Sequence, residues 1–498
     1  MDGFVFRCRQ SSESNLERSK SDREHCRGNR RTKGRFACGD DAACSLAGSQ
    51  STFQARRIAR EIEMKAIAQI IREPAAVRVS SAARRTESIG GLPAAAAGLE
   101  ISAVFLEDGR GLLEYAAQWD DLAANAIEPN VFYEPWMLIP AIEPYSVGRK
   151  IAFVLIVGTD RSRPHSDAVL CGMFPLEISN RYKGLDKNIP IRTLSLWKHK
   201  YCYMCTPLLR RGYAEEALSA FFDWLASFDH GCALMEFRAV PGEGPFHNLL
   251  VDQFNQRGSL SFISESFTRA FFRPASDADE YLKASIGGPS RKEFRRQQNR
   301  LGERGNLEFA SLEYGGDVNA WIDEFLQLEA ISWKGQEGRA LISRPEDRAY
   351  FEEIAVQAFR RGKLMMSALR LDGRAIAHKC NFLSKPGSFA FKIAYDDEFA
   401  RYSPGVLLEL ENIRRLHLMP DIEWMNSCAN PRNAMINRLW SDRLVIRDVV
   451  IGTSRAPGDF VLSAMPMLKW LNRALFRRKI DSKIPDARHA VVHKVTSI

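Results

Sequence analysis

The chain has 498 residues, of which 45% are hydrophobic and 26% are charged, and its formal net charge is +9. This size and composition predict a globular protein of two or three domains. A charge this small for the length predicts no nucleic-acid partner, although it suits anionic ligands. The sequence has no run of about 18 uncharged apolar residues and no apolar signal-peptide core, so we expect no membrane-spanning helix and a cytoplasmic protein.

The ten cysteines are scattered along the chain, which predicts free thiols rather than a disulfide framework. His199, Cys202 and Cys205 form an H-x-x-C-x-x-C cluster. A structural zinc ion needs a fourth ligand, usually from a second close pair, and the sequence shows neither. We therefore predict no metal site and interpret these cysteines as half-buried strand residues.

Composition and hydrophobic spacing divide the chain into five parts. Residues 1–99 are polar and rich in small residues, which predicts a disordered or poorly ordered extension. Residues 100–273 mix strands and helices irregularly, which is typical of a mixed α/β sheet. The expected strands are 101–106, 151–157, 168–176, 191–196, 201–208 and 233–238, and the expected helices are 111–126, 134–138, 214–227 and 245–256.

Residues 274–305 form a basic helical connector. Ser290 is placed to cap a helix, and Phe294 and Leu301 lie seven residues apart on one face of it. The other positions carry Arg291, Lys292, Arg295, Arg296, Arg300 and Arg304. Two interpretations stay open: the helix holds phosphates or an acidic partner, or it is a solvated connector docked by its two apolar residues.

Residues 306–455 repeat the plan of the first half. Helices are expected at 318–333, 345–361, 403–417 and 431–439, and strands at 307–312, 363–371, 375–382, 389–395, 422–425 and 444–451. The order of two helices, a strand hairpin, a strand, a helix and a strand is the same in both halves. We therefore predict an α/β protein made of two tandem copies of one mixed-sheet fold.

The most informative stretch runs from residue 388 to residue 417. Ser403 is a good N-cap residue, Pro404 fits the first helical position, and Gly405 leaves the first turn without a side chain. Val406, with Leu410 and Ile413, turns one apolar face toward a sheet. A helix start of this kind attracts anions such as a pyrophosphate, although any capped strand-turn-helix has the same appearance.

Residues 456–498 form an amphipathic, basic tail. Leucines 468, 471 and 475 and Trp470 accompany a series of Lys and Arg residues. The tail either lies on an anionic membrane surface or docks back onto the protein, and docking is the more common outcome for such helices.

Four segments of the second half carry a family resemblance: LEAISWKGQEG (328–338), LRLDGRAIAHKCNF (369–382), FKIAYDDEFARYSPGVLLELENIRRLH (391–417) and MNSCANPRNAMINRLW (425–440). They resemble the acetyltransferase-like domain of the GNAT superfamily in its CelD-type form, which is associated with cellulose biosynthesis. That domain is related to the FemAB aminoacyltransferases, which consist of two GNAT-like halves. The resemblance is closest over 277–452, extends loosely over 100–273, and implies two GNAT-like halves.

The resemblance implies a co-substrate, acetyl-CoA or another acyl-CoA, and no metal. GNAT enzymes hold the CoA pyrophosphate on the backbone amides of a glycine-containing loop that opens a helix. The matching positions here are Arg401, Ser403, Pro404, Gly405 and Val406. This stretch departs from the family pattern, because it has one glycine and Pro404 lacks an N–H group; an aminoacyl-tRNA donor or a lost site stays an alternative.

Direct transfer of an acyl group needs a proton acceptor and a donor to the leaving thiolate, but no enzyme nucleophile. Asp396 is the candidate base and Tyr395 the candidate acid, since both lie where the strand ends; turn capping and packing are the alternatives. His378 on the neighbouring strand is a further proton-handling candidate or a buried histidine. Trp333 and Lys334 are candidates for substrate binding, as is Asn426.

The resulting hypothesis is an acyltransferase that moves an acyl group, acetyl in the first instance, to an amine or hydroxyl of a small-molecule or polysaccharide-related acceptor. Two alternatives stay open. One is a non-catalytic GNAT pair that serves as an accessory protein of a polysaccharide synthase complex, and the other is a FemAB-like aminoacyltransferase. The expected partners are the acceptor, such a complex, and a membrane surface for the tail.

Overall fold

The structure of the protein is a computed structural model that describes residues 86–87, 99–160, 168–183 and 189–481. Side chains are described for 99–160, 168–183 and 189–470. All these residues belong to one compact unit, Ser80–Ile498. The predicted extension 1–99 lies outside the described residues apart from 86–87 and 99, as do the last residues of the predicted tail.

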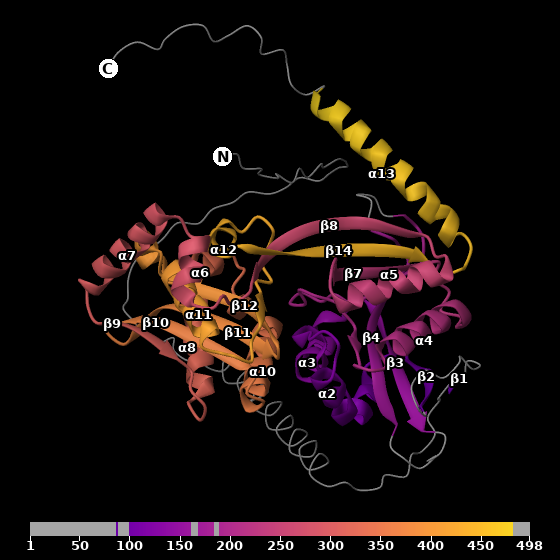
Figure 1. The fold of residues 1–498 in the computed structure, drawn as a ribbon, viewed down its shortest axis with the longest axis horizontal. Coiled ribbons are helices and arrows are strands. Elements are labelled where there is room, and N and C mark those ends of the chain that lie inside the picture. The colour runs from indigo at the N-terminus through magenta and orange to yellow at the C-terminus, as the bar shows by residue number, and fades with distance from the viewer. Residues whose placement is uncertain (1–85, 88–98, 161–167, 184–188, 482–498) are drawn as a thin grey trace, which may run out of the picture. The chain divides into compact units, whose positions relative to one another are not determined.

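Within the described residues, fourteen strands form one continuous sheet in the order β1-β2-β3-β4-β5-β7-β14-β8-β13-β12-β11-β10-β9, with β6 paired to β4 (Figure 1). The strands of the first half are β1 (Thr86–Glu87), β2 (Leu99–Leu106), β3 (Lys150–Asp160), β4 (Val169–Ser179), β5 (Thr193–Leu196), β6 (Leu208–Leu209), β7 (Leu234–Pro241) and β8 (Ser261–Phe272). Those of the second half are β9 (Leu307–Ser311), β10 (Leu364–Leu371), β11 (Arg374–Ser384), β12 (Gly387–Tyr395), β13 (Trp424–Asn426) and β14 (Asp442–Gly452).

Helices cover the sheet. In the first half they are η1 (Arg110–Tyr115), α2 (Ala116–Ala124), η2 (Val131–Tyr133), α3 (Pro135–Tyr145), α4 (Ala214–Ser227) and α5 (Pro245–Arg257). In the second half they are α6 (Ala278–Ser285), α7 (Gly288–Gly302), α8 (Val318–Ile331), α9 (Trp333–Gln336), η3 (Leu341–Ser343), α10 (Pro345–Arg360), η4 (Asp397–Tyr402), α11 (Pro404–His417), α12 (Ala434–Leu439) and α13 (Gly458–Asp481).

The two halves repeat one strand order, which confirms the predicted fold class. β2 to β5 are antiparallel neighbours, and β5 then pairs in parallel with β7. In the same way, β9 to β12 are antiparallel neighbours, and β12 pairs in parallel with β13. β14 lies between β7 and β8, so the last strand of the second half completes the sheet of the first half.

The halves are packed together through one hydrophobic core that contains residues of both. The rings of Phe132 and Phe389, one from each half, lie 5.6 Å apart. The buried carboxylate of Glu134 accepts hydrogen bonds from Lys363 (2.5 Å) and from the Ser384 hydroxyl (2.6 Å). Because a buried carboxylate with these partners cannot separate from them cheaply, the halves are expected to behave as one body.

Several predicted elements need correction. The predicted strand 201–208 shrinks to β6, Leu208–Leu209, and the preceding residues run irregularly against the second half. The predicted helix 318–333 ends at Ile331, because Ser332 is extended and its hydroxyl accepts the Lys334 N–H to start α9. Ser290 does not cap α7, whose N-cap is Gly287; its hydroxyl accepts a hydrogen bond from Arg438 instead.

Candidate functional site: parted strands beside a basic groove

The site begins where β12 and β13 separate. Only Gly387–Phe389 of β12 pair with Trp424–Asn426 of β13, whereas β12 continues to Tyr395. A bulge in β12 accompanies the separation, because Cys380 and Asn381 of β11 oppose Lys392 and Ala390. Bulges bend a strand and redirect its side chains. The second half of β12 therefore presents its outer edge to a gap between two parallel strands.

The N-terminus of α11 opens at this gap. Pro404 has no N–H group, and the N–H groups of Val406 and Leu407 donate to the Ser403 carbonyl at 2.9 and 3.1 Å. Within this turn, the Gly405 N–H is the amide for which the described residues offer no acceptor. Ser403 occupies the N-cap position with φ of 52°, but its side chain makes no capping bond.

Gly405 lies in a tight setting. A methyl group at its Cα would come within 3.3 Å of Tyr395 Cδ1 and 3.7 Å of Ile393 Cδ1. A side chain at this position would therefore press on β12. A ligand approaching the Gly405 amide must pass beside the half-buried Tyr395 ring.

A basic groove adjoins the same helix start. It has a volume of about 470 Å³, and its lining comes from α7, the two residues after it and η4: Glu293, Arg296, Gln297, Arg300, Glu303, Arg304, Arg401 and Tyr402. Arg296 is paired with Glu293 at 2.7 Å, whereas the other three arginines form no ion pair with any carboxylate in the described part of the chain. Four guanidinium groups against two carboxylates leave the groove positive. The connector helix and the Arg401–Val406 stretch, separate signals in the sequence, thus meet at one place.

The arginines of the groove are arranged around Tyr402. The Arg401 Cζ lies 4.8 Å and the Arg304 Cζ 5.9 Å from the centre of its ring. A hydrogen bond from Arg304 lowers the pKa of the Tyr402 phenol. The groove is therefore built to stabilise negative charge, which is the property an anionic ligand needs.

On the other face of β12, a buried carboxylate organises two lysines. Glu329 of α8 accepts hydrogen bonds from Lys392 at 2.9 Å and from the Leu341 N–H at 2.8 Å. Lys334 lies 3.6 Å from the same carboxylate and donates to the Ile393 carbonyl at 2.5 Å. Burial lowers the pKa of Lys334 to about 8, although Glu329 opposes the shift.

The predicted substrate residue Trp333 is close to this group. Its side chain is hydrogen-bonded to Tyr395, whose phenol pKa is raised chiefly by burial. The guanidinium of Arg339 lies 5.6 Å from the Trp333 ring centre. Trp333, Lys334 and Tyr395 therefore stand together at the end of β12, and their functional roles stay predictions.

The other two predicted catalytic residues are placed differently. Asp396 accepts hydrogen bonds from the Glu398 N–H (3.0 Å) and from Arg374, so both of its oxygens hold the turn before η4. His378 is fully buried on the α8 face of β11, with its ring 5.1 Å from that of Trp321 and its Nε2 3.6 Å from Glu324. Burial lowers the pKa of His378, which keeps it neutral near pH 7. These positions match the structural alternatives, turn capping and a buried histidine, and the catalytic roles remain predictions.

The first-half loop before β6 covers the β13 side of the gap. Asn426 ends β13, its side chain accepts the Cys428 N–H at 2.9 Å, and its amide nitrogen lies 2.7 Å from Met204 Sδ of that loop. The Tyr203 ring lies 6.2 Å from that of Phe391, the bulge residue of β12. Burial raises the pKa of the Cys428 thiol to about 12, which argues against a thiolate nucleophile.

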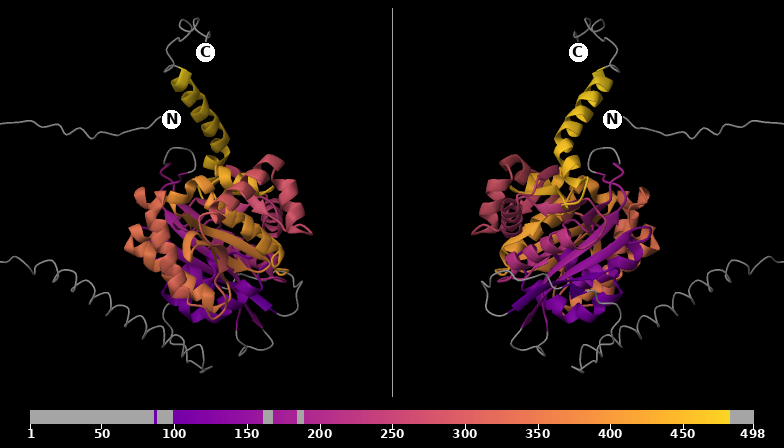
Figure 2. Two further views of the ribbon diagram at one scale, coloured as in Figure 1. Left: turned by 90° about the vertical axis from the view of Figure 1, so that its left-hand side faces the viewer. Right: turned by 90° about the vertical axis from the view of Figure 1, so that its right-hand side faces the viewer.

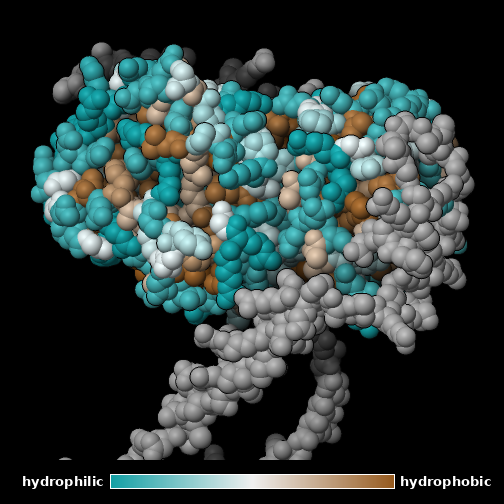
Figure 3. Space-filling view, turned by 60° about the horizontal axis from the view of Figure 1, so that its bottom comes forward, coloured by the Kyte–Doolittle hydropathy of each residue, from teal (hydrophilic) through white to brown (hydrophobic). Residues whose placement is uncertain are grey.

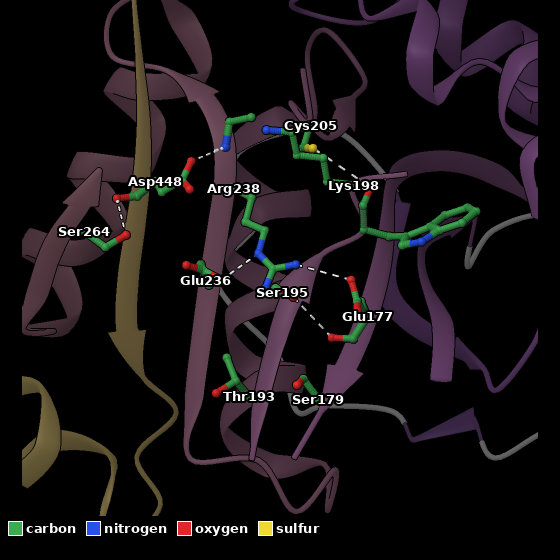
Figure 4. Close-up of polar contacts among 12 residues, drawn as sticks. Glu177, Ser179, Thr193, Ser195, Lys198, Cys205, Glu236, Arg238, Ser264 and Asp448 are labelled. Carbon is green, nitrogen blue, oxygen red and sulfur yellow. Dashed lines mark hydrogen bonds and ion pairs between the residues drawn. The ribbon is translucent and has the colours of Figure 1, made fainter. Parts of the chain in front are cut away.

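The corresponding place in the first half is closed by side chains (Figure 4). β5 and β7 also part, after Ser195 and Glu236, but Arg238 fills the opening and binds Glu236 at 2.6 Å and Glu177 at 3.3 Å. The helix that follows, α4, carries two acidic residues in its first turn, whereas α11 carries none. Acidic residues there satisfy the helix dipole and repel a phosphate. The opening in the first half is therefore filled by Arg238 and followed by an acidic helix start, whereas the helix start in the second half carries no acidic residue.

No group of three or more metal-type ligands occurs among the described residues. Cys202 and Cys205 have their sulfur atoms 3.8 Å apart, and His199 Nδ1 accepts the Tyr201 N–H at 3.3 Å. His199 is thus oriented by its own loop.

Sequence reasoning missed several residues of the site. Glu329 lies on the otherwise apolar inner face of a helix, and Arg269 lies in the apolar run FTRAFF. One signal in the sequence could have identified them: each is a charged residue at a position that hydrophobic spacing assigns to the core. Buried charges are rare unless they have partners, so such a residue indicates a special role. The residues that contact Glu329 and Arg269 could not be found from the spacing of apolar residues in the sequence.

A family model described as "Acetyltransferase (GNAT) domain" matches residues 289–422, which run from α7 through α11. No curated protein matches the chain in sequence.

Solved structures that are similar share little sequence with this chain. FemX is 10% identical over 68% of this chain and 95% of its own, with a TM-score of 0.45. The C-terminal domain of a putative lysylphosphatidylglycerol synthetase from Agrobacterium fabrum is 13% identical over 71% and 96%, with a TM-score of 0.40. A tandem GNAT protein from the clavulanic acid biosynthesis pathway is 12% identical over 72% and 100%, with a TM-score of 0.34.

The matched segment contains the groove, the parted strand β12 and the helix that opens at the gap. The described first half repeats its strand order. Residues 289–422 thus match a GNAT acetyltransferase domain.

Proposed function

We propose that the protein is an acyltransferase whose second half binds an acyl-CoA donor and whose first half has lost that capacity. The single observation that carries this proposal is the meeting of three features at one place. These are an unpaired amide at Gly405, a groove with three unpaired arginines, and a strand edge that no neighbouring strand covers. The equivalent opening of the first half is occupied by Arg238, which is consistent with one donor site per chain.

The residues of this chain fit the donor in part. The 3′,5′-ADP and pyrophosphate groups of CoA are polyanionic, which suits Arg300, Arg304 and Arg401. The outer edge of β12 offers backbone groups to the amides of the pantetheine arm. The cradle itself is narrow, because Pro404 and the internal bonds of Val406 and Leu407 leave one amide. We therefore assign most of the affinity for phosphate to the arginines.

When bound, the donor supplies an activated thioester that an amine or hydroxyl can attack without an enzyme nucleophile. Lys334 holds the Ile393 carbonyl at the gap and, with a pKa of about 8, is neutral in part of the population near pH 8. Its amine is therefore the group on this edge best suited to accept a proton. The Tyr395 phenol, kept protonated by its raised pKa, is the candidate donor to the leaving thiolate.

The proposed acceptor class is drawn from the family resemblance. We place it among amines and hydroxyls of small molecules or saccharides, following the CelD-type resemblance. A role in polysaccharide or cellulose biosynthesis, and contact with a synthase complex, belong to this proposal in the same way.

Thermal unfolding in the presence of acetyl-CoA tests the donor site. Acetyl-CoA is expected to raise the melting temperature, because a ligand that binds only the folded state stabilises it. Gly405→Ala should reduce the shift, since its methyl group would press on Tyr395 and displace the edge of the cradle. Gly302→Ala in α7 is the matched control, because a methyl group there meets nothing within 4 Å.

Two outcomes would contradict the proposal. The absence of a shift with millimolar acetyl-CoA would favour the non-catalytic alternative, to which Pro404 in the cradle already points. An equal shift in wild type and Gly405→Ala would place the donor elsewhere.

A further inference from the structure

Arg269 of β8 is a buried cation without a counter-ion. Its side chain is 5% exposed, and no carboxylate in the described part of the chain lies within ion-pair distance. One of its five N–H groups donates to the Tyr203 carbonyl at 3.0 Å, whereas the buried Nε has no partner. Its guanidinium also lies 5.4 Å from the ring centre of Phe267.

A buried arginine in this state costs stability, because charge taken from water is compensated only by partners. The other buried Lys or Arg of the described chain, Lys379, has a partner, since it binds Glu409 at 2.6 Å. The half-buried Arg238 binds two glutamates. Burial lowers the pKa of Arg269, but a guanidinium stays charged in proteins. The buried charge of Arg269 therefore does not stabilise the fold, and its presence requires another explanation.

The position of Arg269 supplies one. Its guanidinium interacts electrostatically with Cys428 and with Tyr203. Cys428 follows the end of β13, and the Tyr203 ring faces the bulge of β12. Arg269 thus lies on the β13 side of the gap, while the lysines held by Glu329 lie on the β12 side.

We propose that Arg269 binds a carboxylate of the acceptor. A guanidinium fork matches a carboxylate with two parallel hydrogen bonds, and pairing strengthens as the site excludes water. The donor phosphates have their own arginines at the α7 groove, so the anion at Arg269 belongs to the second substrate. This inference rests on the proposed function for the identity of the ligand, and it narrows the acceptor to molecules that carry a carboxylate near the reacting amine or hydroxyl.

The test separates a binding role from a structural one. Arg269→Met removes the charge and keeps the length of the side chain, and Arg273→Met removes an exposed arginine directly after the same strand. Without ligand, Arg269→Met is expected to melt no lower than wild type, because an unpaired buried charge has been removed. Tens of millimolar acetate should raise the melting temperature of wild type and of Arg273→Met, and neither acetamide nor chloride at equal ionic strength should do so.

In Arg269→Met the acetate shift should disappear, while the acetyl-CoA shift persists. Arg269→Lys keeps a charge without the fork and should bind acetate at least tenfold more weakly. A clear loss of stability in Arg269→Met, or an acetate shift equal to that of wild type, would overturn the proposal. An inorganic phosphate shift that exceeds the acetate shift and disappears in Arg269→Met would also overturn it and move the donor phosphates to this arginine.

The second arm of the test uses turnover. Amino acids and their C-terminal amides are offered as paired acceptors with acetyl-CoA, and products are detected by mass spectrometry. Wild type should prefer the free acid at least tenfold, and Arg269→Met should lose the preference. Because the acetate arm needs no donor, a failed acetyl-CoA response with an intact acetate response would refute the proposed function and leave the anion site standing.

A second inference rests on α13. Leu462 and Met465 of this helix are buried with Tyr182, Leu234 and Val450, and Lys469 donates to the Ser264 carbonyl at 2.6 Å. The first half of the helix therefore lies on the sheet, whereas its end projects from the body (Figures 1 and 2). Leu468 and Trp470, on which the predicted docking rested, are not buried.

The outer side of the helix is apolar and uncovered. Phe460, Met467 and Trp470 are 79%, 58% and 67% exposed, and Leu468 is 37% exposed. On the face of the body seen in Figure 3, apolar residues are scattered among hydrophilic ones. The residues that follow in the sequence bring four basic residues and one acidic residue into the last turns of α13: Arg473, Arg477, Arg478, Lys479 and Asp481.

We infer that α13 binds an anionic lipid surface. The charge of its end complements acidic headgroups, and exposed aromatic residues beside basic ones are typical of helices that lie in a membrane interface. No helix of the described residues has the length and apolar character to cross a bilayer, so the contact would be peripheral.

Sedimentation with vesicles tests this surface. The full chain should bind vesicles of phosphatidylcholine with phosphatidylglycerol at least tenfold better than phosphatidylcholine alone. The triple variant Phe460→Ser, Met467→Ser and Trp470→Ser should lose that binding, and Leu418→Ser, an equally exposed apolar residue on the body, should keep it. Unchanged binding in the triple variant, or concentration-dependent self-association that the triple variant abolishes, would overturn the inference.

Discussion

We predict that CoA binding depends on the unpaired arginines of the groove. Replacing Arg304 and Arg401 by glutamine removes two of its three unpaired cations and leaves the fold untouched, because both side chains are exposed. A unit charge pair at about 4 Å in water is worth about 1 kcal/mol, so the double variant should lose about 2 kcal/mol of CoA binding. That loss corresponds to about 30-fold weaker binding at about 1.4 kcal/mol per tenfold change.

The same 30-fold weaker binding predicts how CoA changes the melting temperature of each variant. At a CoA concentration of about 100 Kd the wild type gains about 2.7 kcal/mol of stability. At that concentration the double variant would be at about 3 Kd and gain about 0.9 kcal/mol. The CoA-induced shift in melting temperature should therefore fall to about one third, and raising the salt should shrink the wild-type shift in the same direction.

Controls isolate the phosphates. Arg295→Gln removes an exposed arginine of α7 that does not line the groove, and it should leave the shift intact. Pantetheine, which lacks the phosphates, should give equal shifts in wild type and in the double variant. If the double variant and Arg295→Gln respond alike to CoA, the groove does not hold the donor and the reasoning is wrong.

Three further changes test the surrounding structure. Lys379→Met leaves Glu409 charged and unpaired in the core, so urea unfolding should show a loss of about 3–5 kcal/mol; adding Glu409→Leu should restore part of it. Arg238→Met should cost a similar amount by stranding Glu236, yet its CoA shift should equal that of wild type, and a lost shift would mean that the first half takes part in donor binding. The folded-state pKa of Lys334 is about 8 against 10.5 ordinarily, so the unfolded chain binds more protons between these values. Wild type should therefore gain stability relative to Lys334→Met as the pH rises from about 8 to about 10.5, by at most about 3 kcal/mol, and a flat difference would contradict the assigned burial.

Local pattern predicted the elements of the site well. The apolar spacing in the connector helix anticipated that Phe294 and Leu301 are buried and that the arginines face outward. The order of strands and helices anticipated the repeat, and Pro404 with Gly405 anticipated where α11 begins. These features depend on neighbours within one or two turns, which periodicity records.

The same local signals were ambiguous for chemistry. Asp396 and Tyr395 are adjacent in the sequence, but one holds a turn and the other lies against Gly405. His378 was correctly placed on the strand, yet alternation could not show that its face is packed by Trp321 and Phe325 rather than facing a ligand. Which face of a buried strand meets a ligand depends on the helices that cover it.

The sequence alone indicated that the chain contains two copies of one α/β plan, and it located the start of α11, for which anion binding stays a prediction. Tertiary structure alone decided that the connector helix meets that start, about a hundred residues away along the chain. It also decided that Arg238 closes the opening in the first half and that Arg269 is buried beside Tyr203 without a counter-ion in the described chain. The physical reason is that hydrophobic periodicity specifies which side of an element is buried, whereas strand pairing and packing across the sheet decide what each buried side chain meets.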